Sequence, residues 1–291
     1  GSNNTAVGGD AMIDNTADAN TAVGRSALRT NTTGTQNVAV GAYAADAVTT
    51  GSYLTAIGYA ALGANTTGND NVAIGRAALD ANTTASNNVA VGSGCLGANT
   101  TGAQNTAVGT NALDANTTGN YNVALGHGAL TTNTTASYNT GIGANSLEMN
   151  TTGAQNTAVG YEALEENTTG DYNAACGYNA LDANTTGDNN TGMGAFALNN
   201  ATTASNNTAV GYNALGANTT GDDNAAVGSG ALDANTTGSH LTALGYGALG
   251  ANTTASDNTA VGHDALAANT TGTKNNAFGS YALDACTTGE R

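Results

Sequence analysis

The sequence lacks several residue types on which an ordinary globular domain depends. Its 291 residues include no proline and no tryptophan, and the aromatic residues are limited to 11 Tyr and 2 Phe. A conventional core for a chain of this length would contain far more large apolar side chains. Glycine, in contrast, occupies 41 positions. Such a composition is typical of a disordered chain or of a repeat architecture.

Positive charge and long apolar runs are also scarce. Five Lys and Arg stand against 21 Asp and Glu, which gives a formal net charge of −16. Nucleic acids and anionic membranes bind clustered Lys and Arg, so this charge excludes both as partners. No apolar run approaches the roughly 20 residues of a membrane helix, so we expect no membrane insertion. No signal peptide is recognisable, and we interpret residues 1–3 as a leader or an expression remnant.

A repeat of 17 residues fills nearly all of the chain. The string Asn-Thr-Ala-Val-Gly begins at Asn20 and returns with small variations every 17 residues, which gives sixteen uninterrupted units over residues 20–291. Residues 4–19 form one shorter, degenerate unit of 16 residues. The strict placement of apolar residues in these units argues against disorder and predicts a single solenoid domain without a linker.

Positions within a unit, numbered 1 to 17, differ in the changes they tolerate. The consensus is N-T-A-V-G-x-x-A-L-x-A-N-T-T-G-x-x. Position 5 is Gly from Gly8 to Gly279, and position 13 is Thr from Thr16 to Thr287. Position 3 is Ala or Gly, position 4 is apolar, and position 9 is almost always Leu. Positions 6, 7, 10, 16 and 17 vary freely and carry nearly all the charge.

This pattern predicts an all-β parallel β-solenoid (a β-helix or β-roll) of 17 coils. A unit of 17 residues is too short for a helix pair, and its β-branched residues and glycines favour strands and turns. We expect two strands per coil, at positions 1–4 and 8–14, which are residues 156–159 and 163–169 in one unit. Corners follow at the glycines of positions 5 and 15, so Gly109, Gly160 and Gly211 are predicted turn glycines.

Stacked asparagines should satisfy the polar interior of such a coil. Asn fills position 1 in 15 units and position 12 in 14 units, so identical amides can form ladders from coil to coil. The predicted ladder residues are Asn105, Asn116, Asn156 and Asn167, with Thr117 and Thr168 pointing inward beside them. The departures Leu54 and Leu241 at position 1 have no explanation in the sequence.

Strand alternation assigns the side chains to faces. With the apolar position 4 taken as inward, positions 2, 9, 11 and 13 also point inward, whereas positions 3 and 10 point outward. Position 3 is nevertheless never larger than Ala, so we expect Ala107, Ala158 and Ala209 to form a chain–chain interface in a homo-oligomer, most simply a homotrimer. A tight bend inside the coil is the alternative.

The sequence predicts no enzyme, cofactor or metal site. His127, His240 and His263 occupy variable corner positions, and the pairs Glu165-Glu166 and Asp222-Asp223 read as solvated faces, with a weak calcium site as the alternative. Cys95, Cys176 and Cys286 fall at three different repeat positions several coils apart, so we expect three free thiols.

The recurring Asn-Thr-Thr string admits two further readings. It occurs 13 times from Asn31 to Asn269 and is formally a glycosylation acceptor, although a ladder Asn followed by an inward Thr would recur anyway. Ordered threonines also suggest an ice-binding surface. In our assignment, however, only the second threonine of each pair, such as Thr118 and Thr169, points outward.

The unit resembles two groups of fibrous proteins. Asn-Thr-Ala-Val-Gly-x-x-Ala-Leu, as in residues 156–164 and 207–215, resembles the Asn-Ser-Val-Ala-Ile-Gly-x-x-Ser motif of trimeric autotransporter adhesin heads. It is also similar to Thr-Ala-Val-Gly-Tyr-x-Ala-Leu repeats of some bacteriophage tail fibres and bacterial surface proteins. The resemblance implies an extracellular, cell-surface or virion fibre. We therefore expect a structural or adhesive fibre segment that associates with itself and possesses an affinity for a host-surface or matrix glycan, with a head-to-tail filament subunit as the alternative.

Overall fold

The computed structural model describes residues 1–289, in which the regular structure consists of 17 strands of three residues each and no helix. Each strand occupies positions 2–4 of one unit, so every coil contributes one strand. The strands are β1 Thr5–Val7, β2 Thr21–Val23, β3 Val38–Val40, β4 Thr55–Ile57, β5 Val72–Ile74, β6 Val89–Val91, β7 Thr106–Val108, β8 Val123–Leu125, β9 Thr140–Ile142, β10 Thr157–Val159, β11 Ala174–Cys176, β12 Thr191–Met193, β13 Thr208–Val210, β14 Ala225–Val227, β15 Thr242–Leu244, β16 Thr259–Val261 and β17 Asn276–Phe278. The predicted all-β parallel solenoid with a 17-residue repeat is confirmed.

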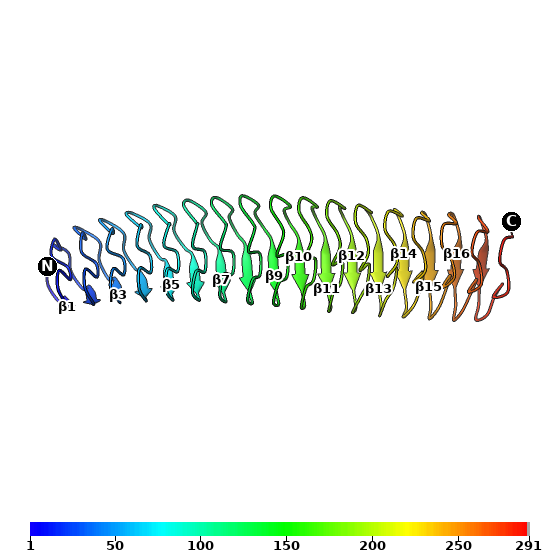
Figure 1. Cartoon of the computed structure of the whole chain (residues 1–291), viewed down its shortest axis with the longest axis horizontal. Helices are drawn as coiled ribbons and strands as arrows, with labels where there is room; N and C mark the ends of the chain where they lie inside the picture. The colour runs from blue at the N-terminus through cyan, green and yellow to red at the C-terminus, as the bar shows by residue number, and fades with distance from the viewer. Residues whose placement is uncertain (290–291) are drawn as a thin grey trace. The chain divides into compact units, whose positions relative to one another are not determined.

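The chain divides into two compact units, Gly1–Ala144 and Asn145–Arg291. The first contains β1–β9 and the second β10–β17, and within each unit successive strands pair in parallel. Pairing joins equivalent positions of neighbouring coils, as for Val72 opposite Val89 in the first unit and Ala158 opposite Ala175 in the second. Figure 1 shows the strand of each coil lying beside the strand of the next within a unit.

The second predicted strand of each coil is wrong. Residues 163–169, for example, form turns and bends. Positions 7 and 9 adopt left-handed backbone conformations, with φ of 52° at Glu162 and 55° at Leu164, whereas a strand requires strongly negative φ. The segment still bonds to the following coil, because the Leu164 N–H donates to the Ala180 carbonyl at 3.0 Å.

Leucine holds this strained position because it fills the apolar interior. Among the described residues, position 9 has φ between 50° and 58° in every coil, which costs a non-glycine residue about 1–2 kcal/mol. Leu113 and Leu164 are fully buried, and burial of such a side chain contributes about 1.5–3 kcal/mol. Glycine would relieve the strain but would leave the interior empty.

The alanines predicted to form a chain–chain interface lie inside the coil instead. Ala107, Ala158 and Ala209 are 0% exposed within the single chain. The interior admits only a methyl group there: a Cβ added to Gly192, which occupies the same position, would lie 3.1 Å from the Ala197 carbonyl oxygen and 3.3 Å from Cγ of Leu181. The small side chain at position 3 therefore reflects a thin core, and positions 2 and 4 point outward.

The other half of the interior is built from asparagine ladders, as predicted. At position 12, Asn116 Nδ2 donates to Asn99 Oδ1 at 2.9 Å and to the Gly119 carbonyl at 3.1 Å. At position 1, Asn105 Nδ2 donates to the same carbonyl at 2.8 Å, and Asn105 Oδ1 accepts the backbone N–H of Asn122. The carbonyl at position 15 thus lies between two ladders.

The second unit repeats this arrangement. Asn156 and Asn167 both donate to the Gly170 carbonyl, at 2.7 Å and 3.1 Å, and Asn167 also donates to Asn150 Oδ1. The threonines of position 13 continue the pattern at the wall of the coil. Thr117 Oγ1 and Thr168 Oγ1 each donate to the position-13 carbonyl of the next coil, at 3.0 Å and 2.9 Å. Both threonines are half-buried rather than inside, and their hydroxyl groups bond to the next coil along the stack.

Candidate functional site: the outward strand face

Positions 2 and 4 of each strand form an outward surface, which we call the strand face. With position 3 in the core, alternation along the strand turns both neighbours to solvent. In the first unit, Val7 is 56% exposed, Ile57 37% and Leu125 45%. In the second unit, Met193 is 49% exposed and Val227 41%. The apolar residue that the sequence placed in the core therefore lies on the surface of the chain.

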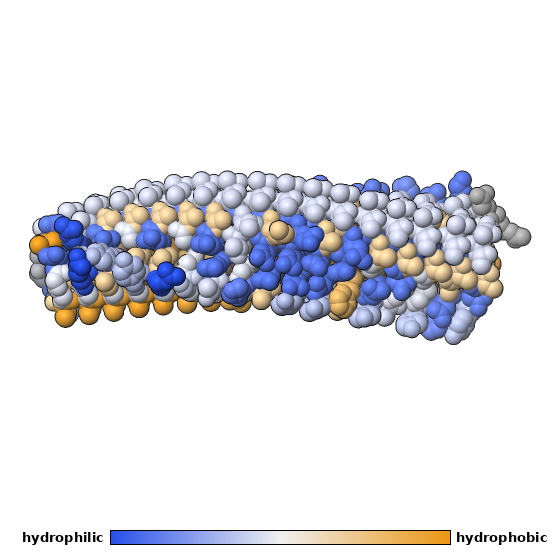
Figure 2. Space-filling view, viewed as in Figure 1, coloured by the Kyte–Doolittle hydropathy of each residue, from blue (hydrophilic) through white to orange (hydrophobic). Residues whose placement is uncertain are grey.

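Charge is absent from this face in every repeat. Position 4 is Val, Ile, Leu, Met, Phe or Cys in all 17 units, although it points outward. Position 2 is Thr or Val except at Ala174, Ala225 and Asn276. Figure 2 shows the resulting apolar row along the first unit. A surface open only to water would admit Lys, Glu or Ser, so the restriction points to a surface that something covers.

The size of the strand face fits that interpretation. At about 4.8 Å between strands, two rows of side chains cover on the order of 400 Å² in each unit. The apolar position-4 row makes up about half of this area and the position-2 row, which is mostly threonine, the other half, so the strand face is a mixed patch close in size to the roughly 300–600 Å² of the largest patches on typical monomers, which are often functional.

A second outward row consists of the threonines at position 14, which we call the outer threonine row. Position 14 is Thr in all sixteen full-length units, and Thr118 and Thr169 are exposed, as predicted. The first coil is one residue short here: Asn15 Nδ2 bonds to the Ala17 carbonyl two residues on, where other coils bond three residues on. The coil closes without position 14, so closure of the coil does not require this threonine.

The Asn-Thr-Thr strings are not glycan acceptors in the folded chain. All thirteen asparagines are 0% exposed, and the amide nitrogen of Asn116 makes two hydrogen bonds inside the coil. The threonine pair also persists where position 12 is no longer Asn, as after Val48 and Ala201. An acceptor motif therefore does not explain these threonines.

Acidic residues gather on the corner of the first coils of the second unit. The pKa of Glu165 is raised to about 7, chiefly because it is partly buried and also because Glu162, Asp182 and Glu148 lie nearby. Asn179 Nδ2 bridges Glu162 and Asp182, at 3.3 Å and 2.9 Å. Burial likewise raises the pKa of Asp182.

Histidines and cysteines do not assemble a reactive centre. His240 lies between Asp223 and Asp257, with nitrogen–oxygen distances of 3.8 Å and 3.5 Å. His263 contacts two tyrosine rings, and its Nδ1 lies 3.1 Å from Oδ2 of Asp264. Across residues 1–289, no three His, Cys, Asp or Glu side chains are grouped so that they could hold a metal ion.

The three cysteines are free thiols in three different environments. Cys95 is buried, Cys176 is exposed on the strand face, and Cys286 is intermediate. The Cys95 thiol donates to the Ala107 carbonyl at 3.1 Å, and burial raises its pKa to about 12. It is therefore protonated at neutral pH and acts as a small core residue.

Comparison with protein-family models and with curated proteins finds no match to this chain. Within the described residues there is also no helix long and apolar enough to cross a membrane.

Proposed function

We propose that this chain is a structural and adhesive segment of an extracellular or virion fibre, which assembles by packing its strand faces against copies of itself. The observation that carries the proposal is the strand face, which points outward yet remains free of charge in all 17 units. Burial of exposed apolar surface is the main driving force for association.

A second copy is the occupant that best matches this surface. The face repeats with the strand spacing, so an identical chain presents the same rows at the same intervals, as closed homo-oligomers require. The face of each unit taken by itself offers on the order of 400 Å² per partner, about half of a standard stable interface. The acids that give the net charge of −16 lie outside positions 1–5, so association does not bury them. Three copies are expected from the resemblance to trimeric adhesin heads.

The test is light scattering coupled to size-exclusion chromatography. We expect a mass near three times 28.2 kDa for the chain as it stands. Leu125→Glu, Val159→Glu and Val227→Glu together should reduce it to a single chain, because buried like charges repel. The matched control replaces Tyr53, Tyr121 and Tyr172 with Glu, since these corner tyrosines are equally or more exposed.

Three results would contradict this proposal. A control triple variant that dissociates as readily would show that added charge alone is responsible. Polymers that lengthen with concentration would favour a head-to-tail filament subunit. A single chain at every concentration would remove the interface, and the outer threonine row would then favour contact with ordered water, as in ice-binding solenoids.

A further inference from the structure

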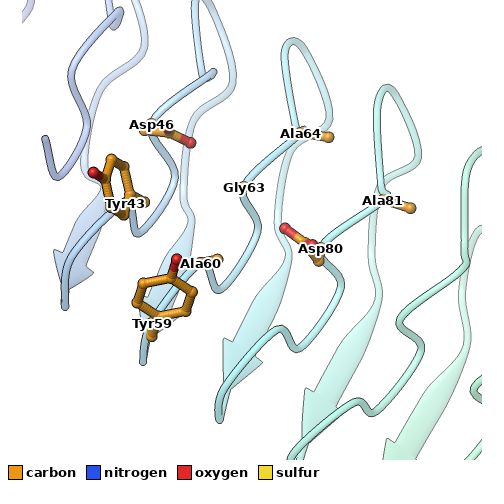
Figure 3. Close-up of a pocket in the computed structure, with 8 residues that line it drawn as sticks. All are labelled: Tyr43, Asp46, Tyr59, Ala60, Gly63, Ala64, Asp80 and Ala81. Carbon is orange, nitrogen blue, oxygen red and sulfur yellow. The ribbon is translucent and has the colours of Figure 1, made fainter.

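A groove opens on a corner of the first unit, and none of the residues that line it belongs to the strand face. It has a volume of about 510 Å³, and its principal lining residues are Tyr43, Tyr59, Asp46, Asp80 and Gly63. Figure 3 shows the two aspartates on either side of Gly63, with the tyrosines beside them. The volume lies within the range of about 300–1,000 Å³ that is usual for small-ligand sites.

Glycine at position 10 opens this groove. Asp46, Gly63 and Asp80 occupy position 10 in three successive coils. The place where a Cβ of Gly63 would lie is 2.5 Å from Asp80 Oδ1 and 3.8 Å from Asp46 Oδ1. Two carboxylate groups therefore converge on one space from the coils before and after it.

Tyrosine rings supply the second wall. The rings of Tyr43 and Tyr59 lie 5.9 Å apart at 80°, and Tyr59 is 58% exposed. The Arg25 guanidinium lies over the Tyr43 ring at 5.2 Å. The charge of Arg29 acts on Asp46. Hydrogen-bond donors, acceptors and aromatic surface thus meet at this corner.

The second unit contains a groove of the same kind. It has a volume of about 360 Å³ and is lined by Tyr212, Tyr246, Asp233 and Gly250, among others. Asp233 Oδ1 lies 3.6 Å from the place of a Gly250 Cβ. Three of the 17-residue repeats combine Tyr at position 6 with Gly at position 10. Each of these repeats lines one of the two grooves.

We propose that these two grooves bind short segments of an oligosaccharide. A sugar ring offers an apolar face, which packs on tyrosine, and hydroxyl groups, which donate to carboxylates and accept from guanidinium groups. A simple cation matches the first groove less well, because Arg25 and Arg29 already supply positive charge there. The sites lie outside the strand face, so the inference does not depend on self-association.

The experiment probes a printed oligosaccharide array with the labelled full chain. We expect binding to at least one class of glycan, measured then by calorimetry with that oligosaccharide. Tyr59→Ala combined with Tyr246→Ala should weaken affinity at least tenfold. Tyr53→Ala combined with Tyr172→Ala is the matched control, because these tyrosines have similar exposure on the other corner and should leave affinity unchanged.

A groove-filling variant keeps the test independent of lost aromatic surface. Gly63→Thr with Gly250→Thr introduces a residue that the fold already accepts at position 10, as Thr131, and should also abolish binding. The proposal is wrong if no glycan binds, if the groove variants bind as well as the controls, or if the grooves bind calcium or spermine and no sugar. The oligomeric mass is measured on the same samples, so that a failure to bind glycans can be distinguished from a failure to self-associate.

Discussion

The glycines at position 5 and at position 15 leave equally little room for a side chain, but only position 15 accepts alanine. A Cβ added to Gly109 at position 5 or to Gly102 at position 15 would overlap the backbone carbonyl of the next coil. Position 15 nevertheless is alanine in four units, as at Ala85 and Ala136. The difference lies in the backbone: Gly109 has a φ of 138°, which L-residues avoid, and the predicted turn glycines Gly160 and Gly211 are alike at 143° and 137°.

Substitution at these columns should therefore give unequal results. Gly109→Ala adds backbone strain to a steric clash and should destabilise the chain by about 2 kcal/mol or more. Gly102→Ala needs only a small shift between coils and should change stability by less than about 1 kcal/mol. Denaturant unfolding of the two variants measures both. Equal losses would show that interstrand crowding, and not φ, fixes glycine at position 5.

At the scale of an element, the position-12 ladder is interrupted in three coils. Val48, Ala201 and Cys286 replace the asparagine. In the coil before each interruption, the side-chain oxygen of Asn31, Asn184 and Asn269, respectively, is buried without a hydrogen-bond partner. A buried polar atom without a partner costs about 1–3 kcal/mol, so each gap is a local weakness.

Completing the ladder should stabilise the protein. Ala201→Asn would place an amide nitrogen next to Asn184 Oδ1 and should raise stability by about 1 kcal/mol. The reverse change, Asn116→Ala, removes a bond to Asn99 and should lower stability by about 2 kcal/mol. Thermal unfolding of both variants measures the expected gain and the expected loss of stability. A loss of stability in Ala201→Asn would mean that the gap has no room for the amide.

The position-1 ladder has a milder interruption. Leu54 and Leu241 still donate their N–H groups to the asparagine of the preceding coil, at 2.9 Å in each case. They offer no side-chain acceptor to the following coil, but both are buried and add apolar area. Leucine gives up two side-chain hydrogen bonds of the asparagine, the donation to the position-15 carbonyl and the acceptance of the next N–H, and the added apolar burial offsets this loss.

The sequence predicted the repeat, the ladders and the glycine corners because each depends on one column of identical residues. It predicted the faces of the strand incorrectly. Alternation places Ala107 and Val108 on opposite faces of the strand but does not determine which face is inside. The size of the coil decides that question, and only the packing around Gly192 reveals it. The grooves were missed because each combines residues of successive coils, and the Tyr–Gly pairing at positions 6 and 10 has no meaning until the coils are stacked.

At the scale of the whole molecule, nearly all of the charge in the sequence stands at the variable positions 6, 7, 10, 16 and 17 of the repeat. In the second unit the crowded acids include Glu165, whose pKa is raised to about 7. Because the pKa of the carboxyl is raised in the folded chain, the folded state binds this proton more tightly than the unfolded state does. The protonated carboxyl therefore contributes its full stabilisation below pH about 4.5, and this stabilisation is lost as the pH rises through about 7. Burial also raises the pKa values of Asp46, Asp80 and Asp114.

Stability should accordingly increase as the pH falls from 8 to 5. Because Glu165 is partly exposed, solvent screening limits its share to about 1 kcal/mol. Glu165→Gln should flatten the pH dependence, whereas Glu166→Gln, its exposed neighbour, should not. Thermal unfolding across this range is the measurement. An unchanged midpoint between pH 5 and 8 would contradict the raised pKa of Glu165.

The register between coils also has a consequence for the gene. Each ladder joins a position to its own equivalent one repeat later, as Asn116 joins Asn99. Unequal recombination that inserts or deletes whole repeats therefore brings equivalent positions of neighbouring coils together again. The number of coils can change between generations without any compensating mutation, so selection can adjust the length of such a protein in steps of one repeat.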